Sequence, residues 1–122
     1  MEHESNLTNA DWRLMDIVWD SEPVESPELC RLAEEKLGWK RTTTYTVLKR
    51  LCEKGFLVNE SSVVTSRVAR REAGKREGSQ IVRRGFKGSL PAFVAAFLEG
   101  GSISGEEAAQ IEKLLEEYRG RE

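Results

Sequence analysis

The sequence predicts a mainly α-helical protein that carries one short β-hairpin. Apolar residues recur at three- and four-residue spacing in several segments, and glycine, proline and capping residues mark the ends of these segments. Two stretches rich in β-branched residues also stand close together between residues 56 and 68. The chain has 122 residues, which suits one compact domain or one small domain with a helical appendage.

Two helices are expected in the first forty residues. The segment "LTNADWRLMDIVWDSEP" begins with Thr8 or Asn9 as its cap and places apolar residues at helical spacing. The segment "ESPELCRLAEEKLGW" has Ser26 as the expected cap, Pro27 at the first helical position and Gly38 as the stop.

A third helix is expected over about residues 42–54, although its first turns contain few strong helix formers. Four of the five residues 42–46 are threonines, whose branching at Cβ restricts the side chain within a helix. Packing of an inward face must therefore hold this helix in place. The residues of that face are Thr44, Val47, Leu48 and Leu51.

A hairpin is expected after the third helix. Residues 56–59 and 63–68 are mostly β-branched or apolar and are separated by the polar break "ESS". An alternative interpretation starts a helix within residues 63–72 and has no hairpin. Three helices followed by a hairpin form a winged helix-turn-helix domain, in which the third helix lies in the major groove of DNA. We expect residues 7–69 to form this domain.

Residues 70–119 are expected to form a helical dimerisation region. The basic segment 70–88 predicts a long helix with four glycines, each costing about 1 kcal/mol relative to alanine in a helix interior. The segments "SLPAFVAAFLEG" and "SISGEEAAQIEKLLEEYRG" predict two short helices whose apolar stripes need a partner, either a second chain or the N-terminal domain of the same chain. The expected dimerisation residues are Phe86, Leu90, Phe93, Val94, Phe97, Ile111, Leu114, Leu115 and Tyr118.

Charge is distributed unevenly along the chain. Residues 1–39 carry a net charge of −7, residues 40–88 carry +9 and residues 89–122 carry −4, so the overall charge of −2 conceals a strongly basic middle third. Such a basic segment is typical of proteins that bind a polyanion. The alternative is that the basic surface pairs with the acidic segments inside the same fold.

Neither catalysis nor metal binding is expected. The chain has one histidine, His3, and two cysteines, Cys30 and Cys52, which sit in separate apolar segments, whereas a zinc site needs three or four clustered ligands. The sequence contains no phosphate-binding glycine loop and no motif of a hydrolase or metalloprotease, so no cofactor is expected. It also lacks a transmembrane segment and a signal peptide, which predicts a cytoplasmic protein without membrane insertion.

The outward face of the third helix carries the candidate DNA-binding residues. Threonine offers a hydroxyl and a methyl group to base edges, and cations ahead of a helix reinforce its preference for phosphate. The alternative is a capping cluster in which one threonine caps the helix and the others are merely tolerated. The candidates are Lys40, Arg41, Thr42, Thr43, Tyr45, Thr46, Lys49 and Arg50, together with Arg67 from the hairpin.

Three segments resemble one family of regulators. The segments "LTNADWRLMDIVW", "SPELCRLAEEKL" and "TTTYTVLKRLCEKGFL" resemble the N-terminal domain of the BlaI/MecI/CopY family, the penicillinase-repressor type of winged-helix regulator. The segment "FKGSLPAFVAAFLEGGSISGEEAAQIEKLLEEY" is similar to the dimerisation helices of that family. The resemblance implies a homodimeric transcriptional repressor that binds an inverted-repeat DNA operator through its third helix and wing.

The resemblance also implies a mode of release. In the β-lactam branch of the family, a membrane sensor-protease signals cleavage of the repressor within the first dimerisation helix, ahead of a phenylalanine. The corresponding bond here is Ala96–Phe97, where the best-known members carry asparagine before the phenylalanine. The copper branch carries a C-terminal cysteine pair. This chain has no cysteine after Cys52, so copper sensing is not expected.

Two other functions remain open from the residues alone. The winged helix could be a protein–protein interaction module whose basic face meets an acidic partner. It could also be a small-ligand-sensing regulator, if Phe86, Phe93 and Phe97 line a pocket rather than a dimer core.

Overall fold

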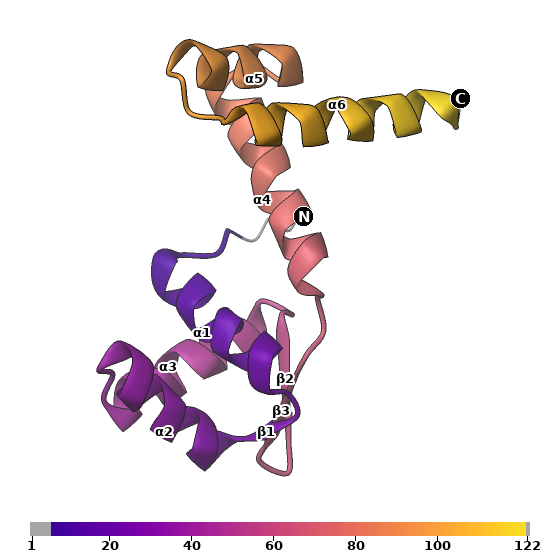
Figure 1. The fold of residues 1–122 in the computed structure, drawn as a ribbon. Helices are drawn as coiled ribbons and strands as arrows, with labels where there is room; N and C mark the ends of the chain where they lie inside the picture. The colour runs from indigo at the N-terminus through magenta and orange to yellow at the C-terminus, as the bar shows by residue number, and fades with distance from the viewer. Residues whose placement is uncertain (1–5, 122) are drawn as a thin grey trace. The chain divides into compact units, whose positions relative to one another are not determined.

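The computed structural model describes residues 6–121, so His3 lies outside the described residues. The chain folds into two compact units, Met1–Gly78 and Ser79–Glu122. The elements in chain order are α1 (Asn9–Ser21), β1 (Val24–Glu25), α2 (Ser26–Leu37), α3 (Arg41–Glu53), β2 (Leu57–Glu60), β3 (Val63–Ser66), α4 (Arg70–Gly85), α5 (Leu90–Glu99) and α6 (Gly105–Gly120) (Figure 1). The predicted fold class, a winged helix followed by further helices, is confirmed. No helix within residues 6–121 is long and apolar enough to cross a membrane.

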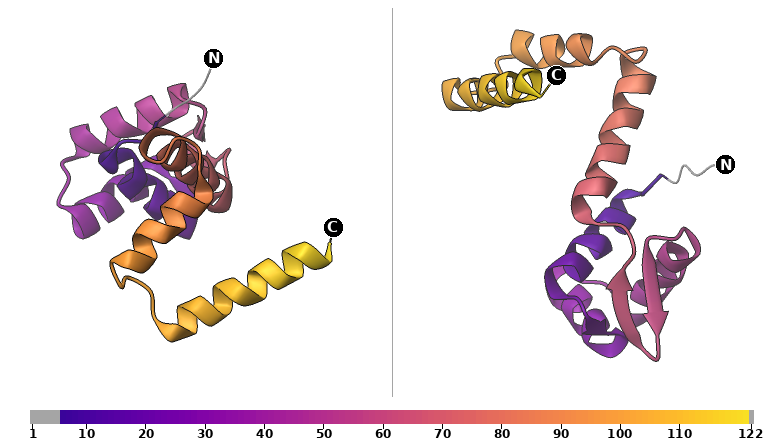
Figure 2. Two further views of the ribbon diagram at one scale, coloured as in Figure 1. Left: turned by 90° about the horizontal axis from the view of Figure 1, so that it is seen from above. Right: turned by 90° about the vertical axis from the view of Figure 1, so that its right-hand side faces the viewer.

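The predicted hairpin is confirmed. Strands β2 and β3 pair antiparallel, with Leu57 opposite Ser66 and Glu60 opposite Val63, and Figure 2 shows the two strands side by side. Because β3 occupies the start of residues 63–72, the alternative interpretation that began a helix there is wrong, and α4 begins only at Arg70. The hairpin forms the wing of the domain.

Strand β1 is not predicted by the sequence. It has only two residues, Val24 and Glu25, which pair with Val64 and Val63 of β3 and complete a sheet in the order β1-β3-β2. Alternation of polar and apolar residues identifies strands only over four or more residues. A two-residue strand therefore leaves no pattern in the sequence.

The start of α2 also differs from the prediction. Ser26 is the first helical residue and is buried, while Glu25 occupies the cap position without a side-chain capping hydrogen bond. The backbone N–H of Ser26 donates to the carbonyl of Ser62 at 2.8 Å, in the turn of the hairpin. The prediction of Ser26 as a cap is wrong because the pairing of β1 with β3 brings this residue against the wing.

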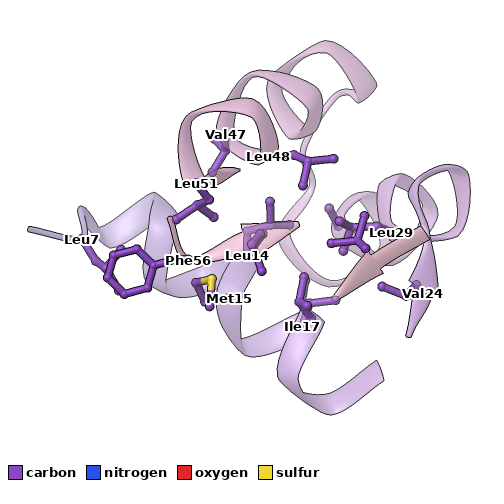
Figure 3. Close-up of a cluster of buried hydrophobic side chains, with 14 of the residues drawn as sticks. Leu7, Leu14, Met15, Ile17, Val24, Leu29, Val47, Leu48, Leu51 and Phe56 are labelled. Atoms are coloured by element: carbon purple, nitrogen blue, oxygen red, sulfur yellow. The ribbon is translucent and has the colours of Figure 1, made fainter. Parts of the chain in front are cut away.

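The core of the first unit lies between the three N-terminal helices and the sheet. Leu14 of α1, Leu29 of α2 and Leu51 of α3 are fully buried, and Figure 3 shows these side chains directed toward one another. Thr44, Val47 and Leu48 are buried with Leu51, which confirms the inward face predicted for the third helix. Burial of this face holds α3 in place although its composition favours other structures.

A buried carboxylate joins α1 to α3. Asp11 forms a capping box with Thr8: its N–H donates to Thr8 Oγ1 at 3.1 Å, and the N–H of Thr8 donates to Asp11 Oδ2 at 3.0 Å. The side chain of Asp11 is 0% exposed and accepts hydrogen bonds from Arg50 Nη2 at 2.8 Å and Lys54 Nζ at 2.7 Å. Burial raises the pKa of Asp11, but the bonds from Lys54, Thr8 and Arg50 outweigh burial and lower it.

Replacement of this carboxylate is expected to destabilise the first unit. Asp11→Ala should lower the free energy of unfolding by about 3 kcal/mol, because it leaves two cations near the core without their partner. Urea unfolding of the full chain measures this change. Glu34→Ala removes an exposed carboxylate of α2 and should change stability by less than about 0.5 kcal/mol. Equal effects of the two variants would contradict the role of Asp11.

The stability of Asp11→Ala is expected to depend less on pH in the acid range than that of the parent protein. Since folding lowers the pKa of Asp11 below its ordinary value of 3.8, the carboxylate stabilises the fold fully above that value. This contribution disappears as the pH falls through the lower pKa of the folded state. Asp11→Ala should therefore lose less stability than the parent protein between about pH 5 and pH 2. If the acid-unfolding curves of Asp11→Ala and the parent protein run parallel, the carboxylate of Asp11 does not contribute to stability in this pH range.

Candidate nucleic-acid interface

The outward face of α3 presents the predicted DNA-binding residues to solvent. All of them except Arg50 are exposed, while the opposite face of the helix is buried in the core. The exposed residues of this surface, called here the α3 face, are Lys40, Arg41, Thr42, Thr43, Tyr45, Thr46 and Lys49.

The first turn of α3 is suited to an anion. Lys40 holds the cap position with extended backbone and makes no side-chain capping hydrogen bond. The exposed amide groups at a helix N-terminus favour negative charge, and the cations of Lys40 and Arg41 stand at this end of the helix. A DNA phosphate placed here would meet both the helix terminus and the two cations.

The threonine hydroxyls are not equivalent. Thr46 Oγ1 donates to the carbonyl of Thr42 at 2.9 Å, and Thr44 Oγ1 donates to the carbonyl of Lys40 at 3.4 Å. Such bonds to the preceding turn are common for threonine within a helix. Because the proton of Thr46 is engaged, this side chain presents its oxygen as an acceptor and its methyl group to an approaching ligand. An amino group of adenine or cytosine, or the methyl group of thymine, matches these two features.

Tyr45 links α3 to the start of α2. Its hydroxyl donates to Ser26 Oγ at 3.4 Å, and the residue is 37% exposed. Since the N–H of Ser26 bonds to Ser62, helices α3 and α2 and the turn of the wing are joined through one buried serine. This role of Ser26 escapes prediction because its partners are 19 and 36 residues away in the sequence.

Two of the predicted DNA-binding residues, Arg50 and Arg67, lie outside the α3 face. The guanidinium of Arg50 is bound to Asp11, at 2.8 Å and 3.1 Å from Asp11 Oδ1, and this side chain is 38% exposed. Arg67 is exposed directly after β3, where its N–H donates to the carbonyl of Phe56. Arg50 thus has a partner within the fold, whereas Arg67 extends from the hairpin into solvent.

The cysteines of the first unit sit in apolar surroundings. Cys30 is buried, Cys52 is half-buried, and burial raises the pKa of the Cys52 thiol, which favours the neutral form over the thiolate that binds metals. Within residues 6–121, no group of three histidine, cysteine or acidic side chains is placed to hold a metal ion.

The second unit exposes large apolar side chains along α5 and α6. On α6, Leu114 is 63% exposed and Tyr118 is 60% exposed, although both belong to the apolar stripe of the helix. The ring of Phe93 packs on the rings of Phe86 and Phe97, with centroids 5.3 Å and 4.9 Å apart. The exposed apolar residues, called here the apolar face, are Leu90, Val94, Phe97, Leu98, Ile111, Leu114, Leu115 and Tyr118.

Comparison with known proteins identifies the family. The family model described as penicillinase repressor matches residues 7–117, which is most of the chain. The chain belongs to the penicillinase repressor family. This family consists of DNA-binding regulators rather than enzymes, and it supports the function of a transcriptional repressor.

Two curated proteins are similar along nearly the whole chain. The penicillinase repressor of Bacillus licheniformis is 25% identical over 119 residues, which cover 94% of this chain and 93% of that protein. An uncharacterised 16.5 kDa protein from the ptsI 3′ region of Latilactobacillus sakei is 27% identical over 118 residues, covering 93% of this chain and 81% of that protein. The predicted resemblance to the penicillinase-repressor family is therefore confirmed.

Proposed function

We propose that this chain is a homodimeric repressor that binds an inverted-repeat operator in double-stranded DNA through α3 and the wing. The observation that carries the proposal is the division of α3 into a buried face and an exposed face of hydroxyls and cations. A helix of this kind fits the major groove, where base edges carry sequence information and phosphates line the rim.

The residues of the α3 face divide by chemistry. The hydroxyl-bearing side chains Thr42, Thr43, Tyr45 and Thr46 are suited to base edges, whereas the cations Lys40, Arg41 and Lys49 are suited to phosphates. Arg67, which lies outside the α3 face directly after β3, is suited to a phosphate as well. The ion pair between Arg50 and Asp11 supports a different role for Arg50, which is to hold α3 against α1.

The apolar face of the second unit supports a homodimer. A patch of exposed leucine, isoleucine and aromatic side chains usually marks an interface, and twofold symmetry matches an inverted repeat. A second copy of the chain is the natural occupant, because two identical stripes can bury one another. Half-buried Phe86 and Phe93 would extend the core of this interface.

Release of the repressor by proteolysis is proposed at Ala96–Phe97. Both residues are exposed and lie in α5, and a cut between them would remove α6 and the end of α5 from the chain. The loss of these residues would remove most of the apolar face and so weaken the dimer. The family resemblance points to a membrane sensor-protease as the source of the signal.

DNA binding is tested on the upstream region of the protein's own gene. With about six phosphates neutralised, affinity should fall about a thousandfold between 50 and 200 mM salt. Thr46→Ala should reduce the preference for operator over random DNA, whereas Lys49→Ala should weaken both about equally and lower the salt slope by about 1. Fluorescence anisotropy at several salt concentrations measures these quantities. Equal affinity of the parent protein for operator and random DNA would refute the proposal.

A further pair of variants identifies the group on Thr46 that contacts the base. Thr46→Val keeps the methyl group, and Thr46→Ser keeps the acceptor oxygen. The variant that preserves the operator preference therefore shows which of these two groups contacts the base. If Thr46→Ala and both of these variants all keep the full operator preference, Thr46 is not in the interface.

Dimerisation is tested by placing a charge in the apolar face. Leu114→Glu should convert the dimer into a monomer in sedimentation experiments, because a carboxylate in an apolar interface is costly to desolvate. Ala109→Glu adds the same charge to α6 on the side opposite Leu114 and should leave the dimer intact. A parent protein that sediments as a monomer would count against the homodimer.

Cleavage is tested in cells exposed to a β-lactam. Mass spectrometry of the recovered protein should detect a fragment of residues 1–96, and Phe97→Ala should prevent its formation. Leu98→Ala changes the neighbouring exposed apolar residue of α5 and should still be cut. Derepression with an intact chain would contradict release by proteolysis.

A further inference from the structure

The beginning of α4 is fastened to α1 by contacts that lie outside both the α3 face and the apolar face. The indole Nε1–H of Trp19 donates to the carbonyl of Val68 at 3.0 Å, two residues before α4 starts. The guanidinium of Arg70, the first residue of α4, lies 5.1 Å from the centroid of the Trp19 ring. It also donates to Asp20 Oδ1 at 3.1 Å and to Asp16 Oδ1 at 3.4 Å.

Buried side chains complete this junction on both sides of Arg70. Val68 is buried and Ala73 is only 2% exposed, and both belong to the core of the first unit. The chain is therefore held through the carbonyl of Val68, the guanidinium of Arg70 and the buried side chain of Ala73, which all lie in the first turn of α4 or just before it. These contacts determine the direction in which α4 starts relative to α1.

The ion pairs of Arg70 with Asp16 and Asp20 contribute little to the stability of the fold. The side chains of Arg70, Asp16 and Asp20 are 52%, 60% and 69% exposed, and ion pairs at such exposed positions contribute little to folding. A planar guanidinium held between an aromatic ring and two carboxylates does, however, define an orientation. Arg70 is thus better suited to fixing the angle of α4 than to holding the fold together.

The direction of α4 matters because this helix is the covalent connection from the first unit to the second. In a dimer that is joined through the second unit, the two α3 helices are separated by a distance that depends on how each α4 leaves its own first unit. Insertion of one base pair moves a half-site by about 3.4 Å and rotates it by about 35°. A fixed direction of α4 would therefore select one spacing of half-sites.

We propose that the junction of Trp19, Val68 and Arg70 sets the spacing between operator half-sites that the repressor accepts. This inference rests on the proposed function, since it requires a dimer on an inverted repeat. Trp19 and Arg70 are then specificity-determining residues that need no contact with DNA.

The experiment uses the full chain and the inverted repeat that the parent protein selects from random-sequence DNA. Operators are made with the centre shortened or lengthened by one or two base pairs, and their dissociation constants are compared. The parent protein should prefer one spacing by about tenfold or more for each base pair changed. Arg70→Ala, and Trp19→Phe, which keeps a ring but loses the N–H donor, should reduce this preference to about threefold or less.

A matched variant separates the junction from simple loss of charge. Arg71→Ala removes the adjacent exposed cation of the same helical turn and should lower affinity for all spacings equally, with the tenfold preference kept. Asp20→Ala breaks the same ion pair from the other side without removing a cation, so it should relax the spacing preference as Arg70→Ala does.

Each other outcome overturns the inference. If Arg70→Ala and Arg71→Ala weaken binding alike and both keep the preferred spacing, Arg70 is a phosphate contact. If Arg70→Ala fails to fold, an unchanged spacing preference in Trp19→Phe and Asp20→Ala is sufficient to overturn it. A parent protein that selects no inverted repeat refutes the proposed function as well, so the two failures can be distinguished.

Discussion

The carboxylate of Asp11 ties the first turn of α1 to the second half of α3, and the position of the α3 face depends on it. The same side chain caps α1 through Thr8 and receives Arg50 and Lys54 from the opposite helix. Two of the cations in the basic middle third of the sequence are thereby held within the fold. The cations of the α3 face, Lys40, Arg41 and Lys49, are exposed instead, so Asp11 binds the cations that hold the fold together and leaves those of the α3 face at the surface.

This anchoring is needed because α3 is weakly supported by its own composition. Its first two turns contain four threonines, and its cap position lacks a side-chain hydrogen bond. Burial of Leu48 and Leu51 and the ion pairs to Asp11 stabilise its C-terminal half. The N-terminal half can consequently use residues chosen for chemistry at the surface rather than for helix propensity.

Features governed by local periodicity could be predicted from the sequence, and features governed by distant partners could not. The inward face of α3 follows from the spacing of Thr44, Val47, Leu48 and Leu51, and the helix ends follow from capping residues such as Ser104. In contrast, the partners of Asp11 lie 39 and 43 residues away. The sequence was sufficient to predict which residues of α3 are exposed. It could not predict the direction of the Thr46 hydroxyl, because that group donates to the backbone carbonyl of Thr42, which lies within reach only in the folded helix.

The hydrogen bond between Ser26 and Ser62 restricts the conformational freedom of the turn of the wing. Ser61 and Ser62 both adopt left-handed backbone conformations, with φ of 52° and 67°, which suit the tight turn of a twisted hairpin but are unfavourable for serine. The N–H of Ser26 holds this turn from the start of α2. In the proposed complex with DNA, a wing that is already ordered would avoid a loss of conformational freedom that amounts to about 1–2 kcal/mol for each residue. The helix-turn-helix and the wing would then approach the groove as one preorganised surface.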